Sequence, residues 1–489
     1  MTQLVSQDAE TKSRLLERGY IWQGAKLLPS LAVFMVGIAL WLMPVPEGLS
    51  TQVWHLFAIF AATIAGIITL PLPLGSVVFF GMMSILLTRT LSFQELFLSY
   101  AQPSIWMIIT AFFLTGGVIK TNLAQRLSYI FLSGMGSNVM SLSYGIVFCE
   151  FLIAPFVPSI VARSSCIIFP IILSIVKDIN PGDKSAPGYK TAGFLLLVAL
   201  HTSVVSSGMF MTSMSGNLMI AEVAAEQGIY ISWGGWALSS LLPGLVSLLA
   251  TPWIIYALYR PDVEELPAAS KKTKQQLQNL GPVSFQEYAM ASVFVLVLSL
   301  WLFGSHLGIS NVEACFIGLS LLLFLGVISW EDCLGNQTAW NTFFWLGALI
   351  GISAQLKKLG LFSWLGNNVL ALIGQPFWPI ALLMVLGIYF YSHYFFASNV
   401  AHVTALYPTF LLTALEIGAP PYLAALLLAF LSSLFGGLTH YACASGPVFF
   451  STGYIDLKKW WQIGFVCCSF HFLNYLILGS AWLKFLALW

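Results

Sequence analysis

Long apolar runs follow one another along almost the whole sequence and are separated by short polar stretches. Of the 489 residues, 58% are hydrophobic and only 8% are charged, whereas about a quarter of a soluble domain is charged. Such a chain cannot cover a water-facing surface, so we expect a polytopic membrane protein, for which the usual relation between length and domain number does not hold. The net charge of +1 gives no indication of nucleic-acid binding.

The apolar runs indicate an all-α fold with about eleven transmembrane helices, because one helix needs about 20 apolar residues to cross a bilayer. Some of the runs are shorter than this. They lie near residues 28–44, 53–72, 75–89, 105–119, 190–212, 232–258, 288–306, 311–328, 341–356, 420–442 and 462–488.

Two further apolar runs, 139–177 and 377–415, are far longer than one span. Each is interrupted in its middle by proline or by small polar residues. Irregular backbone at membrane depth is tolerated only where protein or a water-filled cavity surrounds it. We therefore expect two re-entrant hairpins, each made of two half-helices.

The two halves of the chain resemble each other. "LWLMPVPEGLS" (40–50) matches "LWLFGSHLGIS" (300–310) at several positions, and the two hairpins fall at corresponding places. Six crossings before a polar linker and five after it give the halves opposite orientations. We expect a cytoplasmic N-terminal segment (1–26), a first repeat (27–258), a cytoplasmic linker (259–287) and a second, inverted repeat (288–489).

Lysines in the linker and basic residues in the N-terminal segment place both in the cytoplasm, and the C-terminus then lies outside the cell membrane. Inverted repeats with paired broken helices are typical of secondary transporters, whose substrate binds at the midplane where the breaks meet. The sequence therefore predicts a transporter. No metalloprotease motif, intramembrane aspartate pair or Ser-His pair at a suitable spacing indicates an enzyme, and no cofactor or metal site is expected.

Each hairpin carries a serine followed four residues later by a cationic or basic side chain, as Ser159–Arg163 and Ser398–His402. The half-helix after each break begins near the serine, and the first N–H groups of a helix bind anions. An Arg grips a carboxylate through two parallel hydrogen bonds, and Asn399 adds an amide. Two such tips suit a substrate with two carboxylates.

Two less specific interpretations remain for these side chains. A charge at this depth costs about 2.5–3.5 kcal/mol or more and needs a partner. Arg163 could therefore form an internal ion pair, for which Glu150 is the nearest candidate in sequence. His402 could be a neutral histidine that is hydrogen-bonded to a carbonyl.

The tips Ser159-Ile160-Val161 and Ser398-Asn399-Val400 are similar to the Ser-Asn-Thr tips of the divalent anion:sodium symporter family, the INDY-type carriers. "TSMSGN" (212–217) and "YACASG" (441–446) correspond to the loops that face them. The resemblance covers nearly the whole chain, and the sequence around the tips resembles that of the branch of citrate/succinate and 2-oxoglutarate/malate exchangers. It implies a homodimer that works by an elevator motion, with the lipid bilayer and small dicarboxylates as partners.

Carried over residue by residue, the resemblance also implies a substrate site made of the two tips and the two facing loops. Its expected residues are Ser159, Val161, Arg163, Ser213, Ser215, Asn217, Ser398, Asn399, Val400, His402, Cys443, Ser445 and Gly446.

The tips depart from the sodium-coupled pattern. Ile160 replaces the first Asn, Val161 and Val400 replace Thr, and aliphatic side chains offer no oxygen to a hard cation such as Na⁺. Arg163 and His402 place positive charge nearby, and our hypothesis is that they stand in for the sodium ions. An empty site would then carry unpaired buried charge that is costly to move, whereas a bound dianion would neutralise it.

These observations predict a sodium-independent exchanger of C4/C5 dicarboxylates such as malate, succinate, fumarate and 2-oxoglutarate, which works by alternating access. A sodium-coupled di- or tricarboxylate symporter and a citrate/succinate antiporter remain as alternatives.

The unequal tips give a first testable prediction. Asn399→Ala should weaken dicarboxylate binding more than Ile160→Ala does, because only the first change removes polar groups from a tip. Titration of the purified variants with malate measures both affinities. An equal loss in the two variants would contradict the assignment of the second tip to the substrate.

Overall fold

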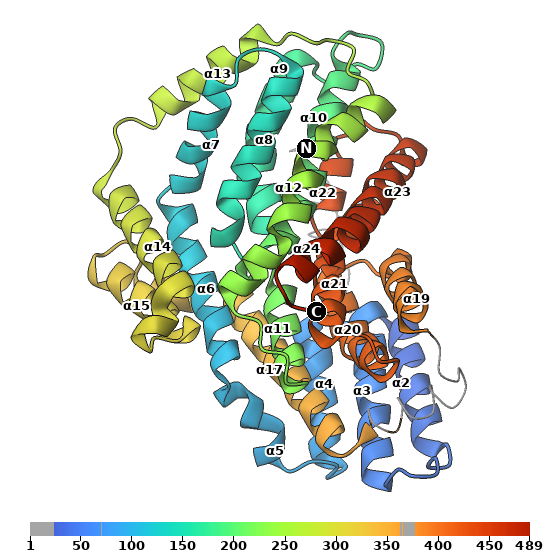
Figure 1. Ribbon diagram of the computed structural model, residues 1–489. Helices are drawn as coiled ribbons and strands as arrows, with labels where there is room; N and C mark the ends of the chain where they lie inside the picture. Colours follow the sequence, from blue (N-terminus) through green and yellow to red (C-terminus); the bar gives the residue numbers. More distant parts are fainter. Residues whose placement is uncertain (1–23, 70, 362–363, 365–376) are drawn as a thin grey trace, which may run out of the picture.

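The computed structural model describes residues 24–69, 71–361, 364 and 377–489 (Figure 1). Within them all regular structure is helical, apart from one isolated β-bridge between Asn138 and Glu265. Most of the expected segment 1–26 lies outside the described residues. Seven described helices are long and apolar enough to cross a membrane, or eight if one bent pair is counted as a span. The expected number of eleven spans stays a prediction.

The helices of the first half are α2 (Leu27–Leu42), α3 (Thr51–Thr69), α4 (Leu74–Leu87), α5 (Phe93–Phe97), α6 (Pro103–Lys120), α7 (Leu123–Gly134), α8 (Val139–Ile153), α9 (Phe169–Ile179), α10 (Tyr189–Met209), α11 (Ser215–Glu226) and α12 (Trp233–Leu258). Then follow α13 (Pro267–Asn279), α14 (Phe285–Phe303), α15 (Asn311–Phe324), α16 (Trp330–Leu334), α17 (Gln337–Lys358), α19 (Trp378–Tyr391), α20 (Asn399–Glu416), α21 (Pro421–Leu434), α22 (Gly446–Phe450), α23 (Leu457–Asn474) and α24 (Ser480–Phe485).

Shorter helical turns mark the places where the longer helices bend or stop. The 3₁₀ turns are η1 (Leu98–Ala101), η2 (Ala154–Phe156), η4 (Met211–Ser213), η5 (Gly304–Leu307), η6 (Ser392–Phe395) and η7 (Phe435–Gly437). The π-helical turns are η3 (Val161–Ile168) and η8 (Tyr475–Gly479).

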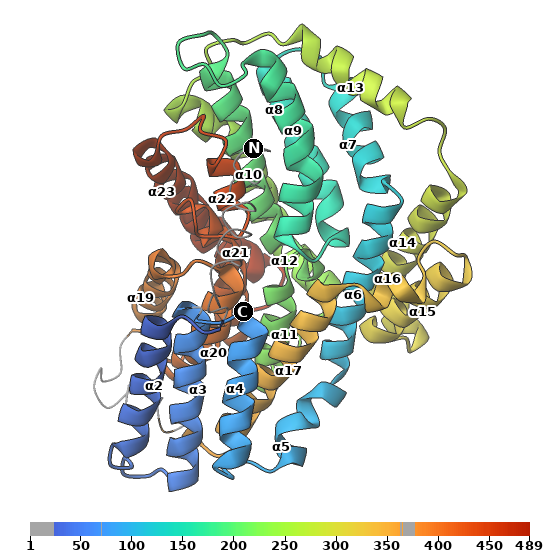
Figure 2. The ribbon, with the colours of Figure 1, turned by 180° about the vertical axis from the view of Figure 1, so that it is seen from behind.

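Both long runs predicted as hairpins are broken helices. In the first, α8 and η2 end before Val157, and the chain resumes as η3 and α9; α8 and α9 both pack against α10 (Figures 1 and 2). In the second, α19 and η6 end before Phe396, and α20 follows. The breaks are therefore confirmed, whereas the entry and exit of each hairpin on one membrane side stays a prediction.

The element order repeats between the halves. In each half the hairpin is followed by a long helix, a 3₁₀ turn and a short helix: α10, η4 and α11 in the first, α21, η7 and α22 in the second. Within the predicted run 420–442, α21 ends at Leu434 and the chain leaves the helical turn η7 after Gly437, so the helical part is shorter than the run. Glycine pairs are frequent points at which a helix bends or stops.

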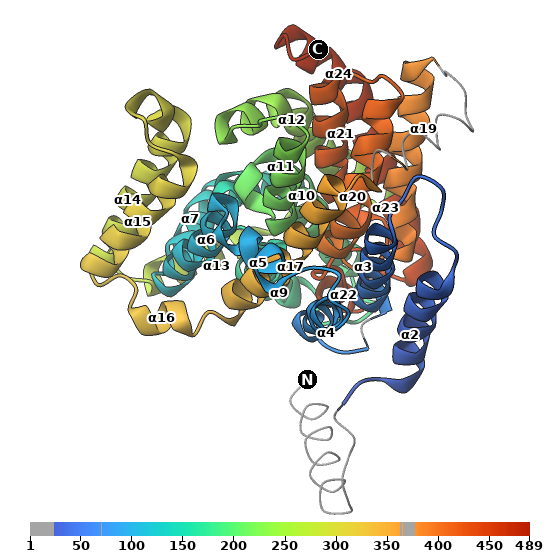
Figure 3. The same cartoon turned by 90° about the horizontal axis from the view of Figure 1, so that it is seen from below.

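The two long helices form the centre of the molecule. Every residue of α10 from Thr191 to Met209 is buried, α21 packs against α10, and the two hairpins pack around them. Seen from below, α14 and α15 lie on one flank and α2 and α3 on the other, with α10, α11 and α21 between them (Figure 3). From behind, α17 runs beside α4 and α6 (Figure 2). The breaks in the hairpins and in the long helices therefore meet in the interior.

The linker is tied to the first hairpin. Lys272 on α13 donates from Nζ to Oδ2 of Asp178 (2.6 Å) and to the carbonyl of Ser174 (2.9 Å), both on α9. After α13, the Arg126 side chain of α7 binds Glu287 at the start of α14, with an Nε–Oε1 distance of 2.5 Å. Arg126 also donates to the carbonyls of residues 280–282, so one side chain fixes the end of the linker.

The Arg126–Glu287 pair should contribute measurably to stability. Their side chains are 9% and 5% exposed, and loss of one partner from a buried pair costs about 3–5 kcal/mol. We expect Arg126→Ala to lower the unfolding temperature in detergent. Lys184→Ala is the matched control, because Lys184 and Asp456 are 69% and 82% exposed and such pairs contribute about 0–1 kcal/mol. Equal melting of the two variants would contradict this prediction.

Candidate functional site

The two serines at the hairpin breaks cap the half-helices that follow them. Ser159 Oγ accepts a hydrogen bond from the N–H of Ala162 (3.3 Å), and Ser398 Oγ accepts one from the N–H of Ala401 (3.4 Å). The N–H of the residue four places on donates to each serine carbonyl, at 3.0 Å for Arg163 and 3.1 Å for His402. The predicted equivalence of the two tips is therefore present in the backbone.

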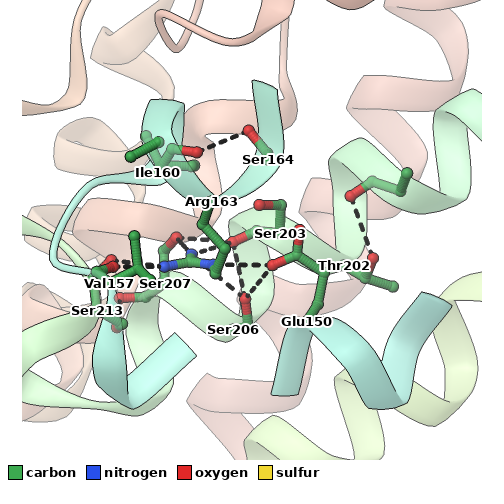
Figure 4. Close-up of polar contacts among 12 residues, drawn as sticks. Glu150, Val157, Ile160, Arg163, Ser164, Thr202, Ser203, Ser206, Ser207 and Ser213 are labelled. Carbon is green, nitrogen blue, oxygen red and sulfur yellow. Dashed lines mark hydrogen bonds and ion pairs between the residues drawn. The ribbon is translucent and has the colours of Figure 1, made fainter. Parts of the chain in front are cut away.

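Arg163 is completely buried, and every N–H of its guanidinium has a partner within the protein (Figure 4). Nε donates to Glu150 Oε2 at 2.8 Å. Nη1 donates to the carbonyls of Val157 and Ser213, both at 3.0 Å. Nη2 donates to the carbonyl of Ser203 at 3.2 Å and to the hydroxyls of Ser206 and Ser207.

The ion pair with Glu150, considered above as an alternative, is thus present. Glu150 is also completely buried, so the positive charge of Arg163 has a fixed counter-charge. In this structure the guanidinium has no N–H left for a substrate carboxylate. A direct grip on the substrate by Arg163 would require these bonds to rearrange.

The carbonyls around Arg163 come from three different elements. Val157 lies in the hairpin break, Ser203 lies on α10, and Ser213 ends the 3₁₀ turn η4 in the facing loop. Breaks in helices leave carbonyls without helical partners. The guanidinium therefore holds together the first hairpin, its long helix and the facing loop, as a bound cation with several oxygen ligands would do.

His402 occupies the corresponding position in the second hairpin and is also completely buried. Its Nδ1 lies 3.1 Å from Nδ1 of His393, and its Nε2 lies 3.1 Å from Oγ of Ser392. The other nitrogen of His393, Nε2, lies 2.7 Å from the carbonyl of Ala442 in the facing loop. Tyr441 Oη in the same loop donates to the carbonyl of Tyr394 (2.9 Å).

Each hairpin is therefore joined to its own facing loop through the predicted side chain, directly by Arg163 and through His393 by His402. The sequence analysis did not include His393 among the site residues. The available signal in the sequence was its position nine residues before His402, at the end of the first arm of the second hairpin.

Two asparagines of the predicted site are held by hydrogen bonds from their side-chain amides to backbone carbonyls. Asn217 Nδ2 donates to the carbonyls of Ser207 (2.7 Å) and Phe210 (3.0 Å). Asn399 Nδ2 donates to those of Ser432 and Ser433, both at 3.3 Å. The carbonyls fix which way each amide points. Both Oδ1 atoms are buried and have no protein partner among the described residues.

The remaining candidates lie on the tips and loops. Ser213 Oγ donates to the carbonyls of Ser207 and Phe210, both at 2.6 Å. Ser164, which the sequence analysis did not single out, donates to Oγ of Ser445 (2.6 Å) and so joins the two halves. Cys443 and Gly446 are buried, whereas Val161, Ser215 and Val400 are partly buried, as are the serines of both tips.

The serines at the tips are partly exposed, whereas the basic side chains behind them are buried. Ala397 at the second tip and Ala444 in the facing loop are exposed, and Ser159 and Ser398 are partly exposed. An anion that reaches a tip meets the serine and the N-terminus of a half-helix first. Within the described part of the chain, no group of three or more His, Cys, Asp or Glu side chains is placed to hold a metal ion.

Residues 24–489 match the family described as "Sodium:sulfate symporter transmembrane region". The chain belongs to this family. It is the divalent anion:sodium symporter family that the tip motifs indicated, so this prediction is confirmed.

Relatives of this family member include proteins named as transporters. "Dicarboxylate transporter 1, chloroplastic" of Arabidopsis thaliana is 42% identical over 471 residues, which cover 96% of this chain and 85% of the relative. "Putative malate transporter YflS" of Bacillus subtilis is 41% identical over 465 residues, 95% and 97% of the two chains. "Inner membrane protein YbhI" of Escherichia coli is 34% identical over 463 residues, 91% and 95%.

Two solved structures share the fold at 12% identity. They are the YdaH transporter of Alcanivorax borkumensis (TM-score 0.53, covering 83% of this chain and 88% of that one) and MtrF of Neisseria gonorrhoeae (TM-score 0.54, 93% and 97%). The described part of the chain therefore has the helical fold of these two proteins.

The buried ion pair yields a prediction about stability. Glu150→Ala removes the counter-charge of Arg163 and leaves a buried cation unpaired, which should cost about 3–5 kcal/mol of unfolding free energy. The double variant Glu150→Leu with Arg163→Met contains no unpaired charge, but the carbonyls that Arg163 binds lose their donor, so it should also melt below the wild type. Thermal unfolding in detergent measures all three proteins. A Glu150→Ala protein as stable as the wild type would contradict the paired state of Arg163.

Proposed function

We propose that the protein exchanges C4/C5 dicarboxylates such as malate, succinate, fumarate and 2-oxoglutarate across the membrane, without sodium. The observation that carries this proposal is the guanidinium of Arg163 between hairpin and facing loop. The guanidinium is a cation that is covalently attached to the chain, and it lies where carbonyls from three elements converge. A tethered cation cannot be released down a gradient, so it cannot drive net uptake.

The substrate class is supported by the two tips and by the relatives. Two capped helix N-termini, each with about half a positive charge, fit a molecule with an anionic group at each end. Relatives over almost the whole chain are named dicarboxylate and malate transporters. Sulfate, which the family description names, has only one anionic centre and would occupy one tip at a time.

The positive charge at the tips supports exchange, but Arg163 does not contribute to this charge as the sequence predicted. Arg163 is neutralised by Glu150 and moves as part of a neutral pair. The unbalanced positive charge of the empty site is therefore that of the two helix N-termini, together with any charge on the histidines of the second tip. A dianion compensates this charge, so the loaded protein crosses a dry barrier more readily than the empty one.

The family resemblance adds two proposals about the assembly. The central hairpins and broken helices would move as an elevator, and two copies would form a homodimer. The distribution of basic residues adds a third proposal, that the N-terminus and the lysine-containing linker face the cytoplasm, with the C-terminus outside.

Sodium-coupled symport is the second candidate, and one observation favours it. Asn399 Oδ1 at the second tip is buried without a protein partner, and a hard cation binds such oxygen ligands. The first tip carries Ile160 in the place of Asn399, and the comparable unpartnered oxygen on its side, Oδ1 of Asn217, lies in the facing loop.

Uptake of labelled malate into proteoliposomes distinguishes the two candidates. We expect uptake only when the vesicles are preloaded with unlabelled dicarboxylate, and the same rate with sodium as with choline, because no releasable cation is part of the first tip. Uptake into empty vesicles that requires an inward sodium gradient would overturn the exchange proposal. Competition by sulfate that exceeds competition by succinate would overturn the proposed substrate class.

A further inference from the structure

The second tip contains a continuous chain of four hydrogen bonds. It runs from the carbonyl of Ala442 to Nε2 of His393, from Nδ1 of His393 to Nδ1 of His402, from Nε2 of His402 to Oγ of Ser392, and from Oγ of Ser392 to the carbonyl of Tyr389. The distances are 2.7, 3.1, 3.1 and 2.9 Å in this order. Both ends of the chain are backbone carbonyls.

A count of protons shows that this chain is one proton short when both histidines are neutral. A carbonyl only accepts, so each of the four bonds needs a proton from a side chain. A neutral imidazole carries one N–H and a serine carries one O–H. His393, His402 and Ser392 therefore supply three protons, and all four bonds form together only when one imidazole is protonated.

Two states of the chain follow from this count. With neutral histidines, His393 donates to Ala442 and His402 donates to His393. The Ser392 hydroxyl then donates to His402, so the carbonyl of Tyr389 receives no hydrogen bond from it. With one added proton, His402 donates from both nitrogens, and the Ser392 hydroxyl turns to Tyr389. A second added proton would place two N–H groups against each other between the rings. The pair thus accepts one proton and excludes a second.

Aromatic rings surround the pair and favour a positive charge on it. His402 stacks on Tyr389 with ring centroids 4.8 Å apart and lies 4.5 Å from Phe435, while His393 stacks on Phe435 at 3.9 Å. Ring faces within about 6 Å attract a cation. The site therefore offers a place for a protonated imidazole although it is closed to water.

The surrounding titratable groups leave the charge of the pair to be balanced from outside. Tyr389 faces His402, and Cys443 follows Ala442 in the loop. Behind Phe435, at Gly437, lie His201 of α10 and Cys468 of α23. Among the described residues no carboxylate forms an ion pair with either imidazole. The nearest place for an anion is the tip at Ser398, one helical turn before His402.

We propose that His393 and His402 together form a binding site for one proton, which fills when a dicarboxylate binds at the hairpin tips. This inference rests on the proposed function, because the bound dianion supplies the missing negative charge. The proton comes from solvent and forms an N–H bond on the histidine pair, and no other bond breaks apart from the hydrogen bond that Ser392 exchanges. Binding of one dianion then adds one net negative charge to the site instead of two.

Calorimetric titration of the full-length protein with malate tests the proposal directly. The titration is made without sodium near pH 7.5, where carboxylates are ionised, in two buffers with different ionisation enthalpies. The difference between the heats gives the number of protons taken up, and we expect about one per malate bound. The double variant His393→Gln with His402→Gln keeps amide donors and acceptors but should take up none.

His440→Gln is the matched control. The His440 ring accepts from Nε1 of Trp461 (3.2 Å) and lies outside the chain of four bonds, so this variant should take up protons as the wild type does. Malate binding without proton uptake in the wild type would overturn this inference and leave the proposed function intact. Absence of any malate binding would overturn the proposed function itself. Proton uptake by the double variant equal to that of the wild type would place the site elsewhere.

A measurement without variants guards against a double variant that does not fold. The protein contains seven histidines, and ¹⁵N-histidine labelling with solid-state NMR separates imidazolium from neutral imidazole. We expect malate to convert one neutral imidazole into imidazolium in the wild type. A spectrum that stays unchanged with malate bound would overturn the proposal.

Discussion

A guanidinium that has no contact with water must find a counter-charge and a partner for each N–H, and this requirement organises the centre of the molecule. Arg163 meets it with Glu150 from the first hairpin arm and with oxygens from the break, from α10 and from the facing loop. The cost of removing these two charges from water is large, so the arrangement is stable only when its geometry is complete. The positions of the hairpin, the long helix and the loop are therefore linked through one side chain.

The breaks in the helices and the buried cation depend on each other. An unbroken helix at this depth satisfies its own carbonyls, and among the carbonyls that bind Arg163 only that of Ser203 lies inside a continuous helix. A break without a cation or another donor would leave carbonyls unpaired in a dry environment, which is costly. Val157 and Ser213 show the match, because each lies in an interrupted segment and the carbonyl of each accepts a hydrogen bond from the same Nη1 of Arg163. The irregular backbone is thus stabilised by the residue that it surrounds.

The sequence predicts the part of this arrangement that depends on residues close to one another along the chain. Hydropathy and the interruptions at proline and small polar residues located both breaks, and the serine spacing predicted the caps at Ser159 and Ser398. It offered Glu150 only as one possible partner of Arg163, because two alternatives were consistent with the same spacing. The bond between Ser164 and Ser445 joins residues 281 positions apart, and no local pattern encodes such a pairing.

The two tips meet the same structural need with different chemistry, and the difference determines what can change during a transport cycle. At the first tip the charge is permanent, since an arginine does not lose its proton in proteins, and its partner Glu150 is equally fixed in place. At the second tip the link to the loop runs through two imidazoles, which change charge between about pH 5 and 8 in ordinary surroundings. A rigid first tip can preserve the geometry of the broken helices in every state of the cycle. In the proposed function, the response to the arrival or loss of a dianion is concentrated at the second tip, where one proton and the rotation of one hydroxyl suffice to change the hydrogen bonds between hairpin and loop.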